Sequence, residues 1–211
     1  MGLAQSSLSN QGVPTPVESL ASAGIIQEAI TSYKISRVSD SLNDGEVTFG
    51  GKDTSKFDPK TLVTLPNVNP QGFWEAQMDA VTVNGQDLGF NNRTAILDTG
   101  TTLLVVPPSD AEAIHRAIPG AKSDGNGGFT IPCTTNASLA LSFGGQLFTI
   151  EPSDLTFVPS NSKDLTGDCV SGISSGQVQG PNEWLNGDVF LKNAYFSTDV
   201  GKNTIQLAKL I

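Results

Sequence analysis

The chain has 211 residues, of which 37% are hydrophobic and only 16% are charged, with 22 glycines and 12 prolines. This length can bury a sizeable core, and the many turn-forming residues favour a mostly β protein over a helical bundle. The net charge of −9 and the isoelectric point near 4.4 argue against a nucleic-acid partner or an anionic membrane surface, and they suit a protein that works in acid. Simple solubility is the alternative explanation of the same charge.

A short helix is predicted close to the N-terminus. Thr15 suits its N-cap, Pro16 and Glu18 suit its first turn, and Gly24 would end it. The apolar stretch 25–30 follows as a short continuation.

From Ser32 onward, alternating apolar and polar residues predict short strands. Residues 33–38 and 46–51 form a hairpin in this interpretation, with Asn43-Asp44-Gly45 as its turn. Further strands are predicted at residues 62–65, 73–78 and 80–83, the last followed by a tight turn at Asn84-Gly85. Within residues 73–78, Phe73 and Trp74 are predicted to pack in the core rather than to touch a ligand.

Another helix is predicted over residues 111–118, after a strand at residues 103–106 and an N-cap at Ser109. We predict that His115 on this helix is a surface residue, because no serine or cysteine nucleophile motif lies nearby. A metal site is not expected, since His115 is the only histidine and no ligand cluster surrounds it. Later strands include residues 139–143 and 146–150.

The segment Ala95–Thr102 is the most informative part of the sequence for function. Apolar residues lead into Asp98, where a strand would end, and Thr-Gly-Thr-Thr follows directly. Gly100 allows the backbone to fold back closely, so that hydroxyl and N–H groups can surround and support one ionised carboxylate. An aspartate in an ordinary strand-end turn is the alternative interpretation of Asp-Thr-Gly alone.

With its flanking residues, this segment resembles the second active-site motif of the pepsin-like aspartic endopeptidases, in their fungal form. The resemblance covers nearly the whole chain, and its other parts occur in the order of the family. They are Met1–Ala4, Gly72–Glu75, the spacing of Cys133 and Cys169, Gly187–Leu191 and Ala194–Asp199. One position departs from the family: Asn186 stands where an apolar residue usually precedes the glycine of an element that threads beneath the catalytic loop.

The resemblance implies a mostly β, pepsin-like acid protease fold, namely the second lobe of a bilobal β-barrel-like enzyme with a few short helices. Residues 1–31 would be a remnant of the N-terminal lobe, and residues 32–211 would be the C-terminal lobe with strands of the interdomain sheet. The implied site residues are Asp98 as a catalytic aspartate, Thr99, Gly100 and Thr101 as supports of its loop, and Thr101 and Thr102 in the substrate cleft.

Enzymes of this family hydrolyse peptide bonds in acid with two aspartates that activate a water molecule, and they need neither a metal nor another cofactor. Asp98 is the only aspartate followed by Thr or Ser and then Gly in this sequence. The chain is therefore expected to be almost inactive alone. Its expected partners are a protein or peptide substrate and a missing N-terminal lobe, present in cis or as a separate chain.

Two other functions stay open at this point. One is a non-catalytic β module that binds peptides or a partner protein. The other is a homodimeric, retropepsin-like peptidase in which two copies of Asp98 build the pair of carboxylates; residues 1–31 would obstruct that symmetric pairing.

The two cysteines lack a CxxC spacing and could form a disulfide or remain as buried thiols. The resemblance implies a bridge between Cys133 and Cys169, which pepsin-like enzymes carry in the second lobe. Asn92 and Asn136 each begin an N-glycosylation acceptor pattern. Together these features favour a secreted or vacuolar protein. The sequence contains no apolar run long enough to cross a membrane.

Overall fold

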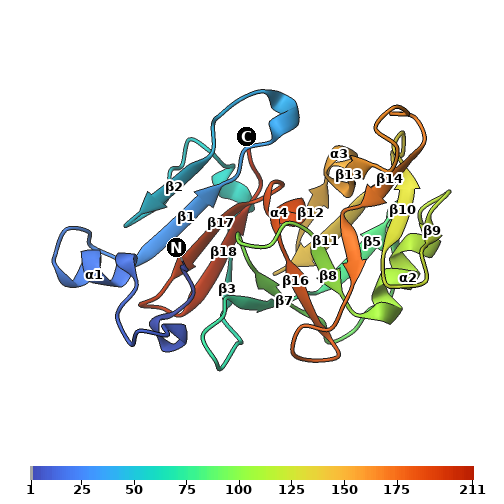
Figure 1. Cartoon of the computed structure of the whole chain (residues 1–211). Helices are drawn as coiled ribbons and strands as arrows, with labels where there is room; N and C mark the ends of the chain where they lie inside the picture. The colour runs from blue at the N-terminus through green and yellow to red at the C-terminus, as the bar shows by residue number, and fades with distance from the viewer. Residues whose placement is uncertain (1) are drawn as a thin grey trace. The chain divides into compact units, whose positions relative to one another are not determined.

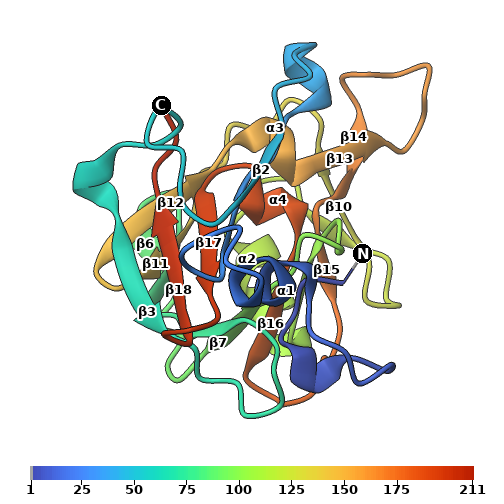
Figure 2. The same cartoon turned by 90° about the vertical axis from the view of Figure 1, so that its left-hand side faces the viewer.

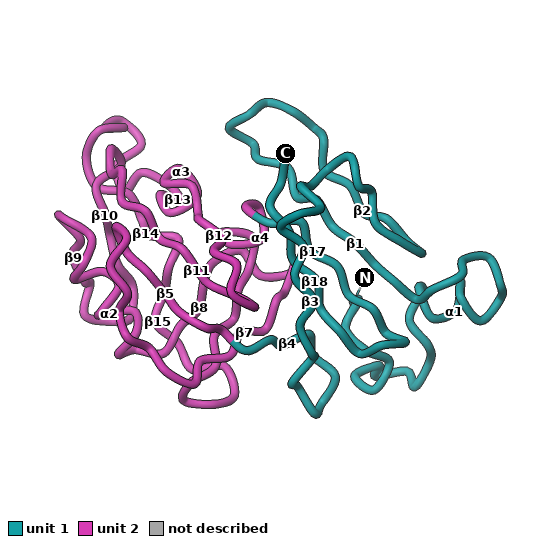
Figure 3. The backbone as a smooth tube through the Cα atoms, turned by 180° about the vertical axis from the view of Figure 1, so that it is seen from behind, with its two compact units in different colours: residues 1–77, 194–211 teal, residues 78–193 magenta. Residues whose placement is uncertain are grey.

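The computed structural model describes residues 2–211, so Met1 of the predicted Met1–Ala4 motif lies outside the described residues. The described chain forms 18 strands, four short α-helices and three 3-10 helices, which confirms the prediction of a mostly β fold. Its contacts divide it into two compact units (Figure 3). The first unit comprises residues 1–77 and 194–211, and the second comprises residues 78–193.

The first unit is built on an antiparallel sheet in the order β2-β1-β17-β18-β3 (Figures 1 and 2). Its strands are β1 (Ile30–Lys34), β2 (Glu46–Phe49), β3 (Val63–Pro66), β17 (Tyr195–Asp199) and β18 (Thr204–Ala208). Polar side chains inside this sheet are satisfied by one another and by the backbone. The hydroxyl of Ser32 donates to the carbonyl oxygen of Gly51 at 2.7 Å and accepts from the hydroxyl of Ser197 at 2.8 Å.

Helix α1 (Pro16–Ser22) of the first unit lies where the sequence predicts it. The Glu18 backbone N–H donates to the Thr15 hydroxyl, and the Glu18 carboxylate accepts from the Thr15 backbone N–H at 2.7 Å, which completes a capping box. Gly24, with a φ of +70°, ends the helix. Residues 25–28 are bends rather than a continuation, and residue 30 already belongs to β1. The other elements of this unit are η1 (Ser6–Leu8), η2 (Val38–Asp40), η3 (Pro59–Thr61) and β4 (Glu75–Gln77).

Strand β1 begins three residues earlier than predicted, and it ends at Lys34 rather than at residue 38. The reason is that β1 is a central strand between β2 and β17 and is covered on both faces, so its buried residues include Thr31 and Ser32. A strand that is buried on both faces does not show the alternation on which the prediction rested. Strand β2 begins at residue 46 as predicted but ends at Phe49 rather than at residue 51. Trp74 packs in the core as predicted, whereas Phe73 is only half-buried.

The second unit contains the sheets β12-β11-β5-β6 and β13-β14-β10-β9 and the strand set β15-β8-β16-β7. In chain order its elements are β5 (Ala80–Val83), β6 (Gln86–Asp87), β7 (Thr94–Leu97), β8 (Leu104–Val106), α2 (Pro108–Arg116), β9 (Lys122–Ser123), β10 (Phe129–Pro132), β11 (Leu139–Phe143), β12 (Gln146–Ile150), α3 (Pro152–Leu155), β13 (Thr156–Pro159), β14 (Asp168–Ser171), β15 (Ile173–Ser175), β16 (Glu183–Asn186) and α4 (Asp188–Leu191). None of the helices in residues 2–211 has the length and apolar character needed to cross a membrane.

The strand set β15-β8-β16-β7 positions the candidate site. Strands β7 and β16 run parallel and pair Ala95 with Trp184 and Leu97 with Asn186, while β8 pairs with β16 in the antiparallel direction. The fully buried Trp184 ring donates its Nε1–H to the Asp110 carboxylate on α2 at 2.9 Å. Arg93 donates to both oxygens of that carboxylate, at 2.7 Å and 2.8 Å. Helix α2 is therefore tied to the strands by a buried charge that has partners.

Helix α2 begins at Pro108, and the prediction that Ser109 caps it was wrong. Proline fits the first helical position because it has no N–H to satisfy there and its φ is already helical. Ser109 is therefore inside the helix, where its hydroxyl donates to the Asp110 carboxylate at 3.2 Å.

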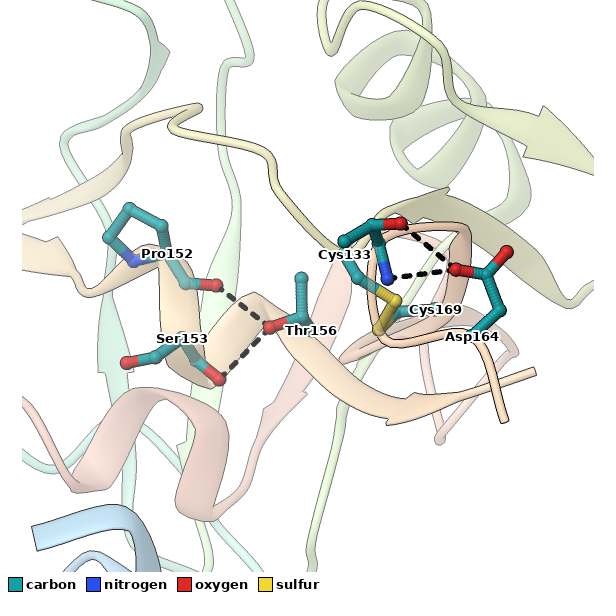
Figure 4. The surroundings of a disulfide bond; sticks show 7 residues. Cys133, Pro152, Ser153, Thr156, Asp164 and Cys169 are labelled. Atoms are coloured by element: carbon teal, nitrogen blue, oxygen red, sulfur yellow. Dashed lines mark hydrogen bonds between the residues drawn. A yellow bond between two sulfur atoms is a disulfide. The ribbon is translucent and has the colours of Figure 1, made fainter. Parts of the chain in front are cut away.

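Cys133 and Cys169 form the predicted disulfide, with their Cα atoms 4.9 Å apart (Figure 4). Cys169 lies in β14 and is paired with Ile131 of β10, so the bond reinforces an existing strand contact. In the same view the Thr156 hydroxyl, at the start of β13, points to the Pro152 and Ser153 carbonyl oxygens. With 36 residues of sequence separation, the chain-entropy model gives the disulfide about 3–4 kcal/mol of stabilisation.

Candidate active site

Asp98 is the first residue after β7, and its backbone is fixed by the neighbouring strand. The buried residues Ile96 and Leu97 lead into it. Its backbone N–H donates to the carbonyl oxygen of Asn186, the last residue of β16, at 3.0 Å. The parallel pairing of β7 with β16 therefore sets where this aspartate leaves the sheet.

The Asp98 side chain is half-buried, and both of its carboxylate oxygens have donors from the following turn. The backbone N–H of Gly100 donates to Oδ1 at 2.9 Å, and the Thr101 hydroxyl donates to Oδ2 at 2.6 Å. A Cβ atom at position 100 would lie 3.1 Å from Oδ1, so glycine lets the backbone come this close. These two donors hold the carboxylate in one orientation.

The other residues predicted for this loop lie at its exposed rim. The Thr99 and Thr102 side chains are exposed. The backbone carbonyl of Thr102 accepts from the Val189 N–H at 3.0 Å. The Thr101 hydroxyl is already bonded to Asp98. Of the two threonines predicted to line a cleft, Thr102 is therefore the one whose hydroxyl is free to meet a ligand within the part of the chain that the structure describes.

The segment from Gly187 to Val189 crosses beneath the loop and is bonded to its backbone. Gly187 N–H donates to the Leu103 carbonyl at 3.1 Å, and Asp188 N–H donates to the Thr101 carbonyl at 2.8 Å. A Cβ atom on Gly187 would lie only 2.2 Å from the Thr101 carbonyl oxygen. The φ of Gly187 is −88°, which suits any residue, so the close approach alone requires glycine.

Asn186, the position that departs from the family pattern, is fully buried between two apolar neighbours. Its register partners are Leu97 on β7 and Leu104 on β8, both buried. Neither the side-chain nitrogen nor the side-chain oxygen of Asn186 has a hydrogen-bond partner among the described residues. An unsatisfied amide in such surroundings destabilises the folded state. Its backbone still supports Asp98, so the cost falls on stability and not on the position of the aspartate.

Asp188 is not among the residues predicted for the site; its only signal in the sequence is its place directly after Gly187. One carboxylate oxygen, Oδ1, is buried and has no hydrogen-bond partner among the described residues. Burial raises the pKa of the Asp188 carboxyl above its ordinary value; the charge of Lys192 opposes this shift and the charge of Asp98 adds to it. The Asp98 and Asp188 carboxylates therefore interact through their charges, although their surroundings differ.

The prediction that His115 is a surface residue was wrong, because only 4% of it is exposed. Helix α2 buries the face that carries Ala111, Ile114 and His115, which are spaced as neighbours on one side of a helix.

No group of three His, Cys, Asp or Glu side chains within residues 2–211 is arranged to hold a metal ion. The acceptor asparagines Asn92 and Asn136 are both exposed.

The sequence of the chain is similar to those of known aspartyl proteases. The sequence model of the eukaryotic aspartyl proteases matches residues 1–210. The chain is 40% identical over 200 residues to the probable aspartic-type endopeptidase CTSD of Trichophyton verrucosum, covering 94% of this chain and 38% of that protein.

Two further relatives broaden the comparison. The chain is 34% identical over 215 residues to the probable vacuolar protease A of Arthroderma benhamiae, covering 99% of this chain and 51% of the relative. It is 35% identical over 200 residues to rhizopuspepsin of Rhizopus chinensis, covering 94% of this chain and 48% of the relative. The chain thus spans about half, or less, of the length of these curated relatives.

We predict that Asn186→Leu stabilises the protein, because leucine has the same branching as asparagine and leaves no buried amide without a partner. The free energy of unfolding should rise by about 1–3 kcal/mol in urea denaturation. Asn186→Ala should raise it less than Asn186→Leu does, because it removes the amide but opens a cavity. Asn126→Leu in an exposed turn should leave it almost unchanged. A loss of stability in Asn186→Leu would mean that the amide has a partner.

Proposed function

The chain belongs to the eukaryotic aspartyl proteases, and from this membership we propose that it supplies Asp98 as one of two catalytic aspartates of an acid endopeptidase. The observation that carries this proposal is the pair of donors on the Asp98 carboxylate, from Gly100 and Thr101. A carboxylate held in one orientation at a half-exposed position can bind and deprotonate a water molecule.

The proposed reaction needs a second carboxylate close to Asp98. Two such groups share one proton, because like charges at that distance do not both ionise. The ionised partner takes a proton from a water molecule between them, and the protonated partner gives its proton to the carbonyl oxygen of the peptide bond. Water attacks the carbonyl carbon directly, so no covalent intermediate with the enzyme forms.

We place the second carboxylate in an N-terminal lobe, encoded upstream of residues 32–211 or present as a separate chain. In this proposal, residues 1–31 are the end of that lobe. Two facts support this assignment: the sequence has one Asp-Thr-Gly, at Asp98, and the chain spans about half, or less, of its relatives. Thr102, with an exposed side chain, would contact the backbone of a protein or peptide substrate.

We further propose that the protein is exported or vacuolar and glycosylated. The disulfide between Cys133 and Cys169 supports an oxidising compartment. The exposed Asn92 and Asn136 side chains support glycosylation, because their acceptor patterns are accessible on the folded surface.

The test of the catalytic proposal is protein digestion near pH 3–4 by the chain alone, by the chain with an added N-terminal lobe, and by the same pair carrying Asp98→Asn. We expect little activity from the chain alone. The pair should cleave between bulky apolar residues and be inhibited by a statine-type transition-state analogue. Asp98→Asn should lower its activity by about 10²–10⁴-fold, because one member of the acid–base pair is lost.

Asp40→Asn is the matched control, because Asp40 is exposed on η2 of the first unit; it should retain full activity. Strong activity of the chain alone at low concentration would refute the proposal. Activity that rises with the square of the chain concentration would favour the homodimeric alternative instead.

Glycosylation is tested by expressing the chain in a fungal secretory host and treating it with peptide N-glycosidase F. We expect a decrease in mass on treatment, and Asn92→Gln and Asn136→Gln should each remove part of that decrease. Asn126→Gln, in an exposed turn without an acceptor pattern, should behave like the unmodified sequence. An unchanged mass after treatment would show that neither asparagine is modified.

A further inference from the structure

His115 is buried in the second unit and makes three specific contacts there. Its Nδ1 lies 2.7 Å from the Ala111 carbonyl oxygen, and its Nε2 lies 2.8 Å from the Ser171 hydroxyl of β14. The ring stacks on Phe129 of β10, with centroids 3.8 Å apart and an angle of 5° between the planes. One side chain thus joins α2 to two strands of the sheet β13-β14-β10-β9.

Of the two neutral tautomers of the imidazole ring, these contacts fit only the one that carries its hydrogen on Nδ1. A carbonyl oxygen can only accept, so Nδ1 carries the hydrogen that points to Ala111, and Nε2 is then the acceptor of a neutral ring. The Ser171 hydroxyl donates to Nε2 and itself accepts the backbone N–H of Ile173 at 3.1 Å. Every donor in this chain of bonds has an acceptor while His115 is neutral.

Protonation of the ring breaks this pattern. Nε2 becomes a donor, so the Ser171 hydroxyl loses its acceptor and must accept from two groups, the imidazolium and the backbone N–H of Ile173. The positive charge would also be buried. Burial lowers the pKa of His115 below its ordinary value, although the bond to Ala111 acts in the opposite direction.

We propose that His115 and Ser171 form an acid-sensitive latch between α2 and β14, and that the protonation of His115 weakens the fold of the second unit as the pH falls. This inference concerns stability and holds whether or not Asp98 takes part in proteolysis. It goes beyond the proposed function, because it assigns a pH-sensing role to a residue outside the catalytic loop.

The charged groups around the latch do not provide a partner for an imidazolium. On α2 itself these are Asp110, which is paired with Arg93, and Glu112 and Arg116. Glu112 and Arg116 line a hollow of about 250 Å³ together with Lys122 of β9 and His115. On β14 the nearby acid is Asp168, which is paired with Lys122 at 2.6 Å. Strands β10 and β15 carry no charged residue. Both ring nitrogens already have partners, so none of these carboxylates hydrogen-bonds the ring.

The direction of the pH effect follows from the lowered pKa. The unfolded chain has a histidine pKa of 6.5, so below that pH it binds a proton that the folded chain does not bind. The stabilisation is complete above pH 6.5 and is lost as the pH falls toward the folded pKa. The folding equilibrium constant should drop by up to about tenfold for each pH unit in that window.

The latch is connected to the candidate active site through short segments. Helix α2 follows β8, which begins directly after the catalytic loop. Ile173, whose N–H reaches Ser171, is the first residue of β15 and is paired with Leu104 of β8. When the contacts of the latch weaken, the packing of β8 should therefore be disturbed before that of strands such as β11 and β12.

The single histidine makes the test direct. The Cε1–H resonance of His115 in the full 211-residue chain is followed by NMR from pH 8 to pH 4. We expect its midpoint below the ordinary 6.5, because the ring is buried. A midpoint near 6.5 in the folded protein would overturn the proposal without the need for any variant.

Urea unfolding between pH 7 and pH 5 provides the second measurement. Below pH 6.5, the equilibrium constant of the native sequence should fall more steeply than that of His115→Gln, which cannot titrate, by up to about tenfold per pH unit. Asp188 also titrates differently in the folded state, but it is present in both proteins, so its effect cancels in the comparison. Arg116→Gln, an exposed neighbour on the same helix, should retain the native slope. Equal slopes for the native sequence and His115→Gln would also overturn the proposal.

Discussion

The crossing of residues 187–189 beneath the loop that follows Asp98 is the constraint on which the candidate site depends. Three backbone hydrogen bonds join these segments: Gly187 to Leu103, Asp188 to Thr101 and Val189 to Thr102. A fourth, from Asp98 to Asn186, fixes the point where the loop begins. The loop between β7 and β8 is therefore held from below by main-chain contacts. Its side chains are not needed to hold the loop, so the Thr101 hydroxyl can donate to the Asp98 carboxylate. This separation explains why a buried, unpartnered Asn186 amide is compatible with a well-placed Asp98.

The same crossing creates two carboxylates in contrasting surroundings. Asp98 lies on the loop, where a backbone N–H and a hydroxyl fix its two oxygens. Asp188 begins α4, and it has one buried oxygen without a partner and a raised pKa. Burial without a donor favours the protonated form of the Asp188 carboxyl. The fold thus places two acids in different hydrogen-bonding surroundings.

Local patterns made part of this structure predictable from the sequence. The capping box at Thr15 and the Asn84-Gly85 turn depend on residues within a few positions of one another, and the structure forms both. The surroundings of Asp98 were also foreseen, because Gly100 and Thr101 follow it directly. Residue spacing alone left the disulfide open, and the family resemblance identified it.

Other features depend on contacts between distant segments, and these were missed. The burial of His115 comes from its contact with Ser171, 56 positions away, although the spacing of Ala111, Ile114 and His115 on one helix face was a usable signal. The extent of β1 was missed because a central strand loses its alternation. The unsatisfied atoms of Asn186 and Asp188 arise only once the crossing is formed, so no local pattern could reveal them.

Amide hydrogen exchange in the native chain and in Gly187→Ala tests most directly whether the crossing holds the loop that follows Asp98. A Cβ atom at that position would meet the Thr101 carbonyl oxygen at 2.2 Å, whereas Gly201→Ala, as a control, meets only a side-chain oxygen at 3.5 Å. We predict that Gly187→Ala speeds exchange at Asp98, Asp188 and Val189 while the strands β11 and β12 remain protected. Native protection of those three amides in Gly187→Ala would contradict the account.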